Sequence, residues 1–167
     1  MKSLYWLILF VSALLITACV NQQCDDVRPE PALNIAFRKY TEPTRNPRQV
    51  RDTTFRLLNA YAVGLEDMPF EISTEPVKNV RLRLSPLADQ TTFVLLSAGA
   101  GTSRQTSTIT ISYTRQPAFI SQACGYEITF TNLSVTNVSP NLDEAAVVVP
   151  TINPIRNEVH IQLFFRP

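Results

Sequence analysis

Histidine and cysteine are scarce in this sequence, and their scarcity excludes one class of metal-binding protein. One His and three Cys among 167 residues are too few ligands for a zinc cluster of these residues. The 15 basic and 14 acidic residues nearly balance, so the composition does not favour a nucleic-acid or polyanion binder. Apolar residues reach 45%, which suffices for the core of one domain and excludes wholesale disorder.

Residues 1–19 resemble the signal sequence of a bacterial lipoprotein. Lys2 supplies a positive start, residues 4–15 are mostly apolar, and small residues precede Cys19. The apolar stretch is shorter than the ~20 residues that a transmembrane helix needs. The resemblance implies that residues 1–18 are a cleaved signal peptide, that Cys19 is acylated, and that residues 19–32 form a tether. The alternative is an ordinary secretory signal that ends near a cysteine.

Two cysteines remain once Cys19 is assigned to lipid. Export would place Cys24 and Cys124 in an oxidising compartment, so we expect a disulfide between them. They stand 100 residues apart, and closing a loop of that order stabilises by about 4–5 kcal/mol in the chain-entropy account. No Cys-x-x-Cys spacing supports a redox dithiol as the alternative.

Apolar residues then repeat with a period of two, which is typical of β-strands. The pattern includes residues 33–37, 80–84 and 109–113 and one face of residues 55–63, and a phase change near Asn132 indicates a β-bulge. About eight or nine short strands predict a single antiparallel β-sandwich over residues 33–167, resembling the immunoglobulin fold. Two stretches interrupt the strands: residues 41–52 are expected as a loop, and residues 141–145 as a short helical turn capped by Asn141.

The residues that carry catalytic chemistry are isolated from one another. His160 falls on the polar phase of the last strand, so we expect it to be exposed and not catalytic. No Gly-x-Ser-x-Gly elbow is present, and residues 99–103 fit a hairpin loop better than a phosphate-binding loop. The sequence therefore predicts no enzyme activity, no metal site and no cofactor site.

Two features leave a binding role open. Basic residues between Arg38 and Arg51 could meet an anionic partner such as lipid headgroups or acidic glycan, although a solvated loop is the simpler interpretation. Phe164 stands on the polar phase beside His160 and could belong to a binding patch. The other aromatic residues considered fall mostly on core phases: Tyr61, Phe93, Tyr113, Phe119, Tyr126, Phe130 and Phe165.

Four segments, residues 24–26, 31–37, 120–126 and 160–165, resemble a family of small Bacteroidota lipoproteins of unknown function. The resemblance supports acylation of Cys19 and pairing of Cys24 with Cys124, and it implies no catalytic residues. We therefore expect a lipid-anchored protein of the cell envelope, on the outer membrane and facing either the periplasm or the cell surface, with a non-enzymatic binding or structural role. An envelope protein or a glycan is the expected partner, and no nucleic acid. The alternative function is a surface glycan-binding module.

Overall fold

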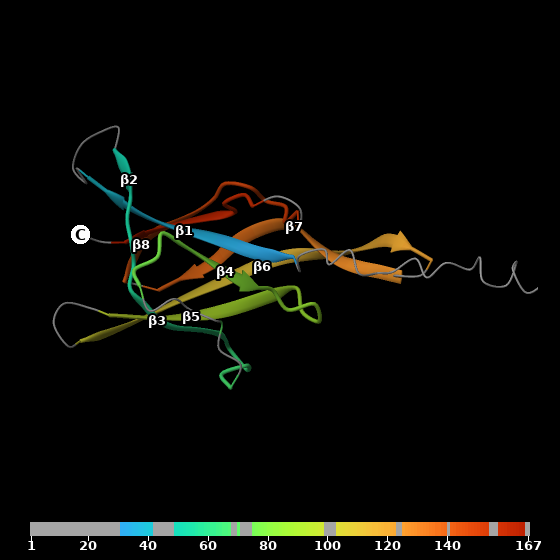
Figure 1. Cartoon of the computed structure of the whole chain (residues 1–167), viewed down its shortest axis with the longest axis horizontal. Helices are drawn as coiled ribbons and strands as arrows, with labels where there is room; N and C mark the ends of the chain where they lie inside the picture. The colour runs from blue at the N-terminus through green and yellow to red at the C-terminus, as the bar shows by residue number, and fades with distance from the viewer. Residues whose placement is uncertain are drawn as a thin grey trace, which may run out of the picture.

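The chain folds as a sandwich of two β-sheets, from one of which a two-stranded arm projects (Figure 1). The computed structural model describes residues 31–41, 49–67, 70, 75–98, 103–122, 125–139, 141–153 and 157–165. Every regular element in these ranges is a strand, so the prediction of an all-β sandwich is confirmed. The immunoglobulin-like character of the sandwich stays a prediction.

The first sheet has five strands, arranged around the first and last strands of the chain. Its order is β2-β1-β9-β8, and β4 also pairs with β1. The start of β1 pairs with β4 and its end pairs with β2, so these two strands share one side of β1. The strands are β1 (Ala32–Tyr40), β2 (Val50–Asp52), β4 (Asn79–Arg83), β8 (Leu142–Val147) and β9 (Ile161–Phe165).

The second sheet has four strands in the order β3-β5-β6-β7, all antiparallel. Its members are β3 (Leu57–Ala62), β5 (Gln90–Ala98), β6 (Arg104–Ser121) and β7 (Gly125–Val138). Ala98 pairs with Arg104 across the β5–β6 connection, as expected for a hairpin around residues 99–103. β6 and β7 are the longest strands, and they extend past the rest of the sandwich at the end where β1 begins (Figure 1).

Alternating apolar residues from both sheets form the core. On β4, Val80 and Leu82 are buried between the exposed residues Asn79, Arg81 and Arg83, as the period of two predicts. Residues with no exposed surface come from β1, β3, β4, β5, β6 and β9 and lie in one cluster: Leu33, Ile35, Phe37, Ala60, Leu82, Phe93, Leu95, Ile109, Ile111, Ile161 and Leu163.

One pair of strands departs from the predicted antiparallel arrangement. β1 and β9 run parallel, with Ile35 opposite Ile161 and Phe37 opposite Leu163. Because β9 lies between β1 and β8, both of its edges are hydrogen-bonded inside the sheet. The last strand is therefore interior and not an edge strand.

Three local predictions are wrong. The expected loop at residues 41–52 contains strand β2, and the expected helical turn at 141–145 lies mostly in strand β8. On β3 a register shift between Leu57 and Asn59 moves the buried face from the odd residues to Ala60 and Ala62. In each case pairing with a neighbouring strand overrides a local sequence preference.

The predicted bulge near Asn132 is confirmed. The β6–β7 register shifts there, because Ser112 pairs with Ser134 while Thr114 pairs with Thr131. Asn132 has φ 54°, a left-handed conformation that Asn tolerates better than most residues.

Candidate binding face on the β6–β7 arm

The arm consists of residues 114–121 of β6 and 125–131 of β7, beyond the point where β6 leaves β5. The last β5–β6 pair is Gln90 with Ser112, whereas β6 and β7 stay paired as far as Ser121 and Gly125. A two-stranded ribbon is marginally stable in water unless one of its faces packs on something. The stability of the arm and its capacity to bind a partner therefore depend on the residues of its two faces.

One face of the arm continues the core-facing row of the sheet. Tyr113 and Phe130 stand on this row at the base of the arm and are buried against each other, with ring centroids 5.2 Å apart. β6 and β7 are in regular register from Thr114 to Phe119, so alternation places two further pairs on the same face. These pairs are Pro117 with Ile128 and Phe119 with Tyr126, which we call the apolar face of the arm.

Ile128, at the inner end of the apolar face, packs partly against the core, whereas the outer pair lacks an opposing layer in the described part of the chain. Phe119 is 60% exposed and Tyr126 is 70% exposed, and their rings meet edge to face with centroids 5.3 Å apart. The opposite face of the arm carries mainly polar residues: Thr114, Gln116, Glu127, Thr129 and Thr131. The arm is thus amphipathic in the same way as a strand pair that covers a core, yet its apolar side is open.

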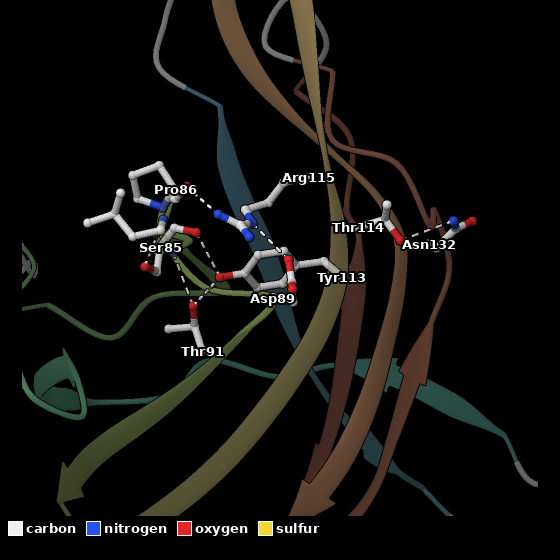
Figure 2. Close-up of polar contacts among 9 residues, drawn as sticks. Ser85, Pro86, Asp89, Thr91, Tyr113, Thr114, Arg115 and Asn132 are labelled. Carbon is white, nitrogen blue, oxygen red and sulfur yellow. Dashed lines mark hydrogen bonds and ion pairs between the residues drawn. The ribbon is translucent and has the colours of Figure 1, made fainter.

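A hydrogen-bonded network around the Tyr113 hydroxyl fixes the base of the arm (Figure 2). The hydroxyl donates to the Ser85 carbonyl oxygen at 2.9 Å and lies 2.6 Å from Thr91 Oγ1. Thr91 Oγ1 also accepts the Ser85 N–H at 3.1 Å. Burial raises the pKa of Tyr113 above its usual value, so the phenol stays protonated and acts as a donor.

Arg115 links the arm to the same β4–β5 connection. Its Nε donates to Asp89 Oδ1 at 2.7 Å and its Nη1 donates to the Pro86 carbonyl at 3.1 Å (Figure 2). Leu87, which follows Pro86 in the chain, is 87% exposed. The surface here has a wide depression of about 560 Å³, lined by Asp89, Tyr113, Thr114, Arg115, Pro117 and Ile128.

The polar groups at the base of the arm are held by one another. Tyr113 is held protonated, and Arg115 and Asp89 are committed to each other. No nucleophile stands beside a base within the depression. No set of three or more His, Cys, Asp or Glu side chains gathers as a metal site in the described ranges. An apolar stripe beside a few fixed polar groups is the arrangement of a docking surface.

The expectation that His160 is exposed is wrong. His160 is only 2% exposed, and its Nδ1 accepts the backbone N–H of Asn34 at 3.0 Å. Burial lowers its pKa, with Arg81 acting in the same direction and Glu158 opposing. The residue is part of the junction between β1 and β9.

Phe164 likewise does not belong to an exposed patch. It is 5% exposed and stacks on Tyr40, with ring centroids 4.8 Å apart. The exposed aromatic residues are instead Phe119 and Tyr126, which the sequence placed on a core phase. In the basic stretch, Arg38 forms an ion pair with Asp52, and Arg51 is exposed on β2.

The predicted lipid and disulfide residues lie outside the described residues. This holds for Cys19, Cys24 and Cys124, for the signal peptide at 1–18 and for most of the tether at 19–32. No helix in the described ranges is long and apolar enough to cross a membrane.

The fold and this face define an all-β sandwich module with a projecting amphipathic arm. The chain belongs to a family of unknown function (DUF6452), which matches residues 58–165, more than half of the chain. The matched region includes the arm and its base, so these elements lie within the family's domain. No curated protein and no solved structure matches the chain.

Proposed function

We propose that this chain is a lipid-anchored cell-envelope protein whose sandwich has a non-enzymatic binding or structural role. The observation that carries the proposal is the position of Ala32, the first residue of β1. Ala32 pairs with Arg83, two residues before the Ser85 carbonyl that accepts the Tyr113 hydroxyl. The proposed tether and the arm therefore leave the sandwich at the same end.

A lipid anchor at that end presents the rest of the sandwich away from the membrane. Acyl chains contribute ~0.8 kcal/mol for each buried methylene, so two or more chains on Cys19 would hold the domain firmly at the bilayer. The isolation of His160 and the protonated state of Tyr113 support a role without catalysis. Residues 1–19 resemble a lipoprotein signal, and Val20 follows Cys19 where some lipoproteins retained at the inner membrane carry Asp, which supports the outer membrane as the location.

Metabolic labelling with a palmitate analogue in a bacterial host tests the anchor. We expect label on the full chain and on Cys24→Ser, and none on Cys19→Ala, which should also move from the membrane to the soluble fraction. Cys24→Ser is the matched control because it removes a cysteine five positions away. Label retained by Cys19→Ala would contradict the proposal.

A surface glycan-binding module is the second candidate, because Phe119 and Tyr126 are exposed aromatic residues on one face. Native electrophoresis through gels containing neutral or acidic polysaccharides tests it. Binding would retard the wild-type chain, and Phe119→Ala with Tyr126→Ala would abolish the retardation. Val148→Ala is the control, since Val148 is an exposed apolar residue on the segment after β8. Equal mobility in gels with and without polysaccharide would exclude this candidate.

A further inference from the structure

We infer that the outer pair of the apolar face, Phe119 and Tyr126, rests in the interfacial region of the phospholipid bilayer beside the arm. This contact rests on the lipid anchor of the proposed function and deepens it, because it determines how the sandwich stands on the membrane. It assigns a partner to the two aromatic rings that the described residues leave open.

The exposed end of the arm has the chemistry of a membrane-interface element. No charged residue occurs in the sequence between Arg115 and Glu127. Glu127 pairs with Ala118 on the polar face, so its carboxylate points away from the two rings. Tyrosine is enriched at the level of lipid headgroups, where its hydroxyl stays hydrated while its ring contacts apolar chains. A bilayer therefore accepts the outer pair without burying a charge.

The tether and the arm are placed to reach the same bilayer. β1 begins at Ala32, opposite Arg83 on β4, at the end of the sandwich from which the arm projects (Figure 1). Phe119 lies beyond Tyr113 on β6 by ~20 Å of extended strand. Ala32 stands 13 residues after Cys19, a length of chain that spans at most ~45 Å. The tether is thus long enough for the rings to touch the membrane and short enough to keep them within reach of it.

The exposed area of the two rings fits a membrane contact better than a protein interface. At their exposures of 60% and 70%, Phe119 and Tyr126 together offer at most ~300 Å². Two copies of the chain packed face to face on these rings would bury ~600 Å², about half of what a stable protein interface needs. A weak contact suffices on a membrane, because the tether keeps the arm at a high effective concentration beside the lipid.

The edges of the arm offer little to a partner strand. The Tyr113 N–H donates to the Asp89 carbonyl at 2.9 Å, so the odd residues of β6 turn their backbone groups toward the edge that β5 leaves open. Pro117 occupies that edge and has no N–H to donate. On β7 the Phe130 carbonyl already accepts the Ile152 N–H at 2.9 Å. The apolar face, and not an edge, is therefore the surface that the arm presents for binding.

Tryptophan fluorescence in vesicles tests the contact in the full chain, purified from a lipoprotein-processing bacterium. The sequence has one tryptophan, Trp6, so in a Trp6→Phe background the variant Phe119→Trp carries a single fluorophore. We expect its emission to move to shorter wavelength in phosphatidylcholine vesicles, and brominated lipid to quench it severalfold more strongly than Val50→Trp. Val50 is the matched control, because it is 51% exposed and pairs with Tyr40 at the other end of β1. Equal quenching of the two variants would overturn the inference.

Lipid composition separates contact through the rings from attraction between charges. Quenching of Phe119→Trp should be the same in zwitterionic vesicles and in vesicles that contain phosphatidylglycerol, at low and at high salt. The reason is that no basic residue lies between Arg115 and the rings. Quenching that occurs only with anionic lipid at low salt would refute the assigned face, because charged groups elsewhere would then hold the domain.

Photo-crosslinking in living cells identifies what covers the face. With p-benzoylphenylalanine in place of Tyr126, irradiation should attach phospholipid to the chain. The same probe in place of Gln116, exposed on the polar face of the arm, should attach none. A product that joins position 126 to a second copy, another protein or a glycan, with no phospholipid attached, would contradict the inference.

Palmitate labelling of the same cells separates this inference from the proposed function. Label on the chain with equal quenching of Phe119→Trp and Val50→Trp leaves the anchor in place and refutes the lipid contact of the arm. Stronger quenching of Phe119→Trp without label refutes the anchor and keeps the lipid contact. Contact with lipid also removes Phe119 and Tyr126 from the surface that a glycan could use.

Discussion

Asn34 and His160 exchange two hydrogen bonds at the point where β1 and β9 meet. The Asn34 N–H donates to His160 Nδ1 at 3.0 Å, and the His160 N–H donates to the Asn34 carbonyl at 2.9 Å. The imidazole nitrogen thus takes the place of a backbone carbonyl at the start of the parallel ladder. Nδ1 can accept only while it is unprotonated, and His160 Nε2 finds no partner in the described part of the chain.

The free energy of unfolding should fall as the pH is lowered below the usual histidine pKa of 6.5. Burial lowers the pKa of His160 in the folded state, so in this window the unfolded chain binds a proton that the native chain does not. Stability is therefore full above about pH 6.5 and is lost progressively as the pH falls toward the lowered pKa. Urea denaturation at pH 7.5 and 5.5 measures the difference.

His160→Asn is the matched control for this effect, because its amide oxygen can accept the Asn34 N–H but does not titrate. We expect this variant to be less stable at neutral pH, since it loses most of a buried ring, and to show a smaller decrease between the two pH values. A decrease as large as that of the wild-type chain would show that carboxyl groups, and not His160, cause it.

The sequence predicted the strand that follows His160 but not its surroundings. Alternation correctly put Ile161 and Leu163 in the core. The same alternation predicted that the other face of the strand is exposed to solvent, whereas His160 and Phe164 on that face are also buried. An interior strand can have both faces covered, and a period of two cannot reveal which neighbours cover them.

Phe164→Ala should lower the free energy of unfolding by about 3–5 kcal/mol, as for other buried phenylalanines. The ring stacks on Tyr40, whose hydroxyl in turn donates to Glu144 on β8 at 2.5 Å. Leu87→Ala is the control and should change stability by less than about 0.5 kcal/mol, because Leu87 is 87% exposed. Thermal unfolding of the two variants side by side checks this, and similar losses would mean that Phe164 is not packed as described.

The bulge at Asn132 leads to a prediction about backbone conformation. Asn132→Val should cost about 1–2 kcal/mol, because a left-handed φ is strained for a β-branched residue. Asn132→Gly should be nearly neutral, since glycine adopts this φ readily. Ser134→Val, also exposed on β7 but with ordinary backbone, is the control. A loss in the glycine variant equal to that in the valine variant would point to the Asn132 side chain instead.

The arm shows where prediction from the sequence stops. The period of two gave Tyr126, Ile128 and Phe130 the correct common face, and the phase change at Asn132 was correct as well. Of these three residues only Phe130 is buried, because β6 and β7 extend beyond the end of the opposing sheet. Strand length relative to the facing layer is a property of the assembled sandwich, so the exposed aromatic pair could not be anticipated.

The phenol of Tyr113 should matter more to the base of the arm than the ion pair of Arg115. Tyr113→Phe leaves the Ser85 carbonyl without this donor and Thr91 without its 2.6 Å partner, which should cost about 1–3 kcal/mol. Asp89→Asn should cost less than about 1 kcal/mol, because the Asp89 side chain is 72% exposed and the pair is screened by salt. Urea denaturation at low and high salt separates the two. The Tyr113→Phe loss should persist at high salt, whereas the Asp89→Asn loss should shrink. The reverse ranking would mean that the charge pair, and not the buried hydroxyl, holds the arm to the β4–β5 connection.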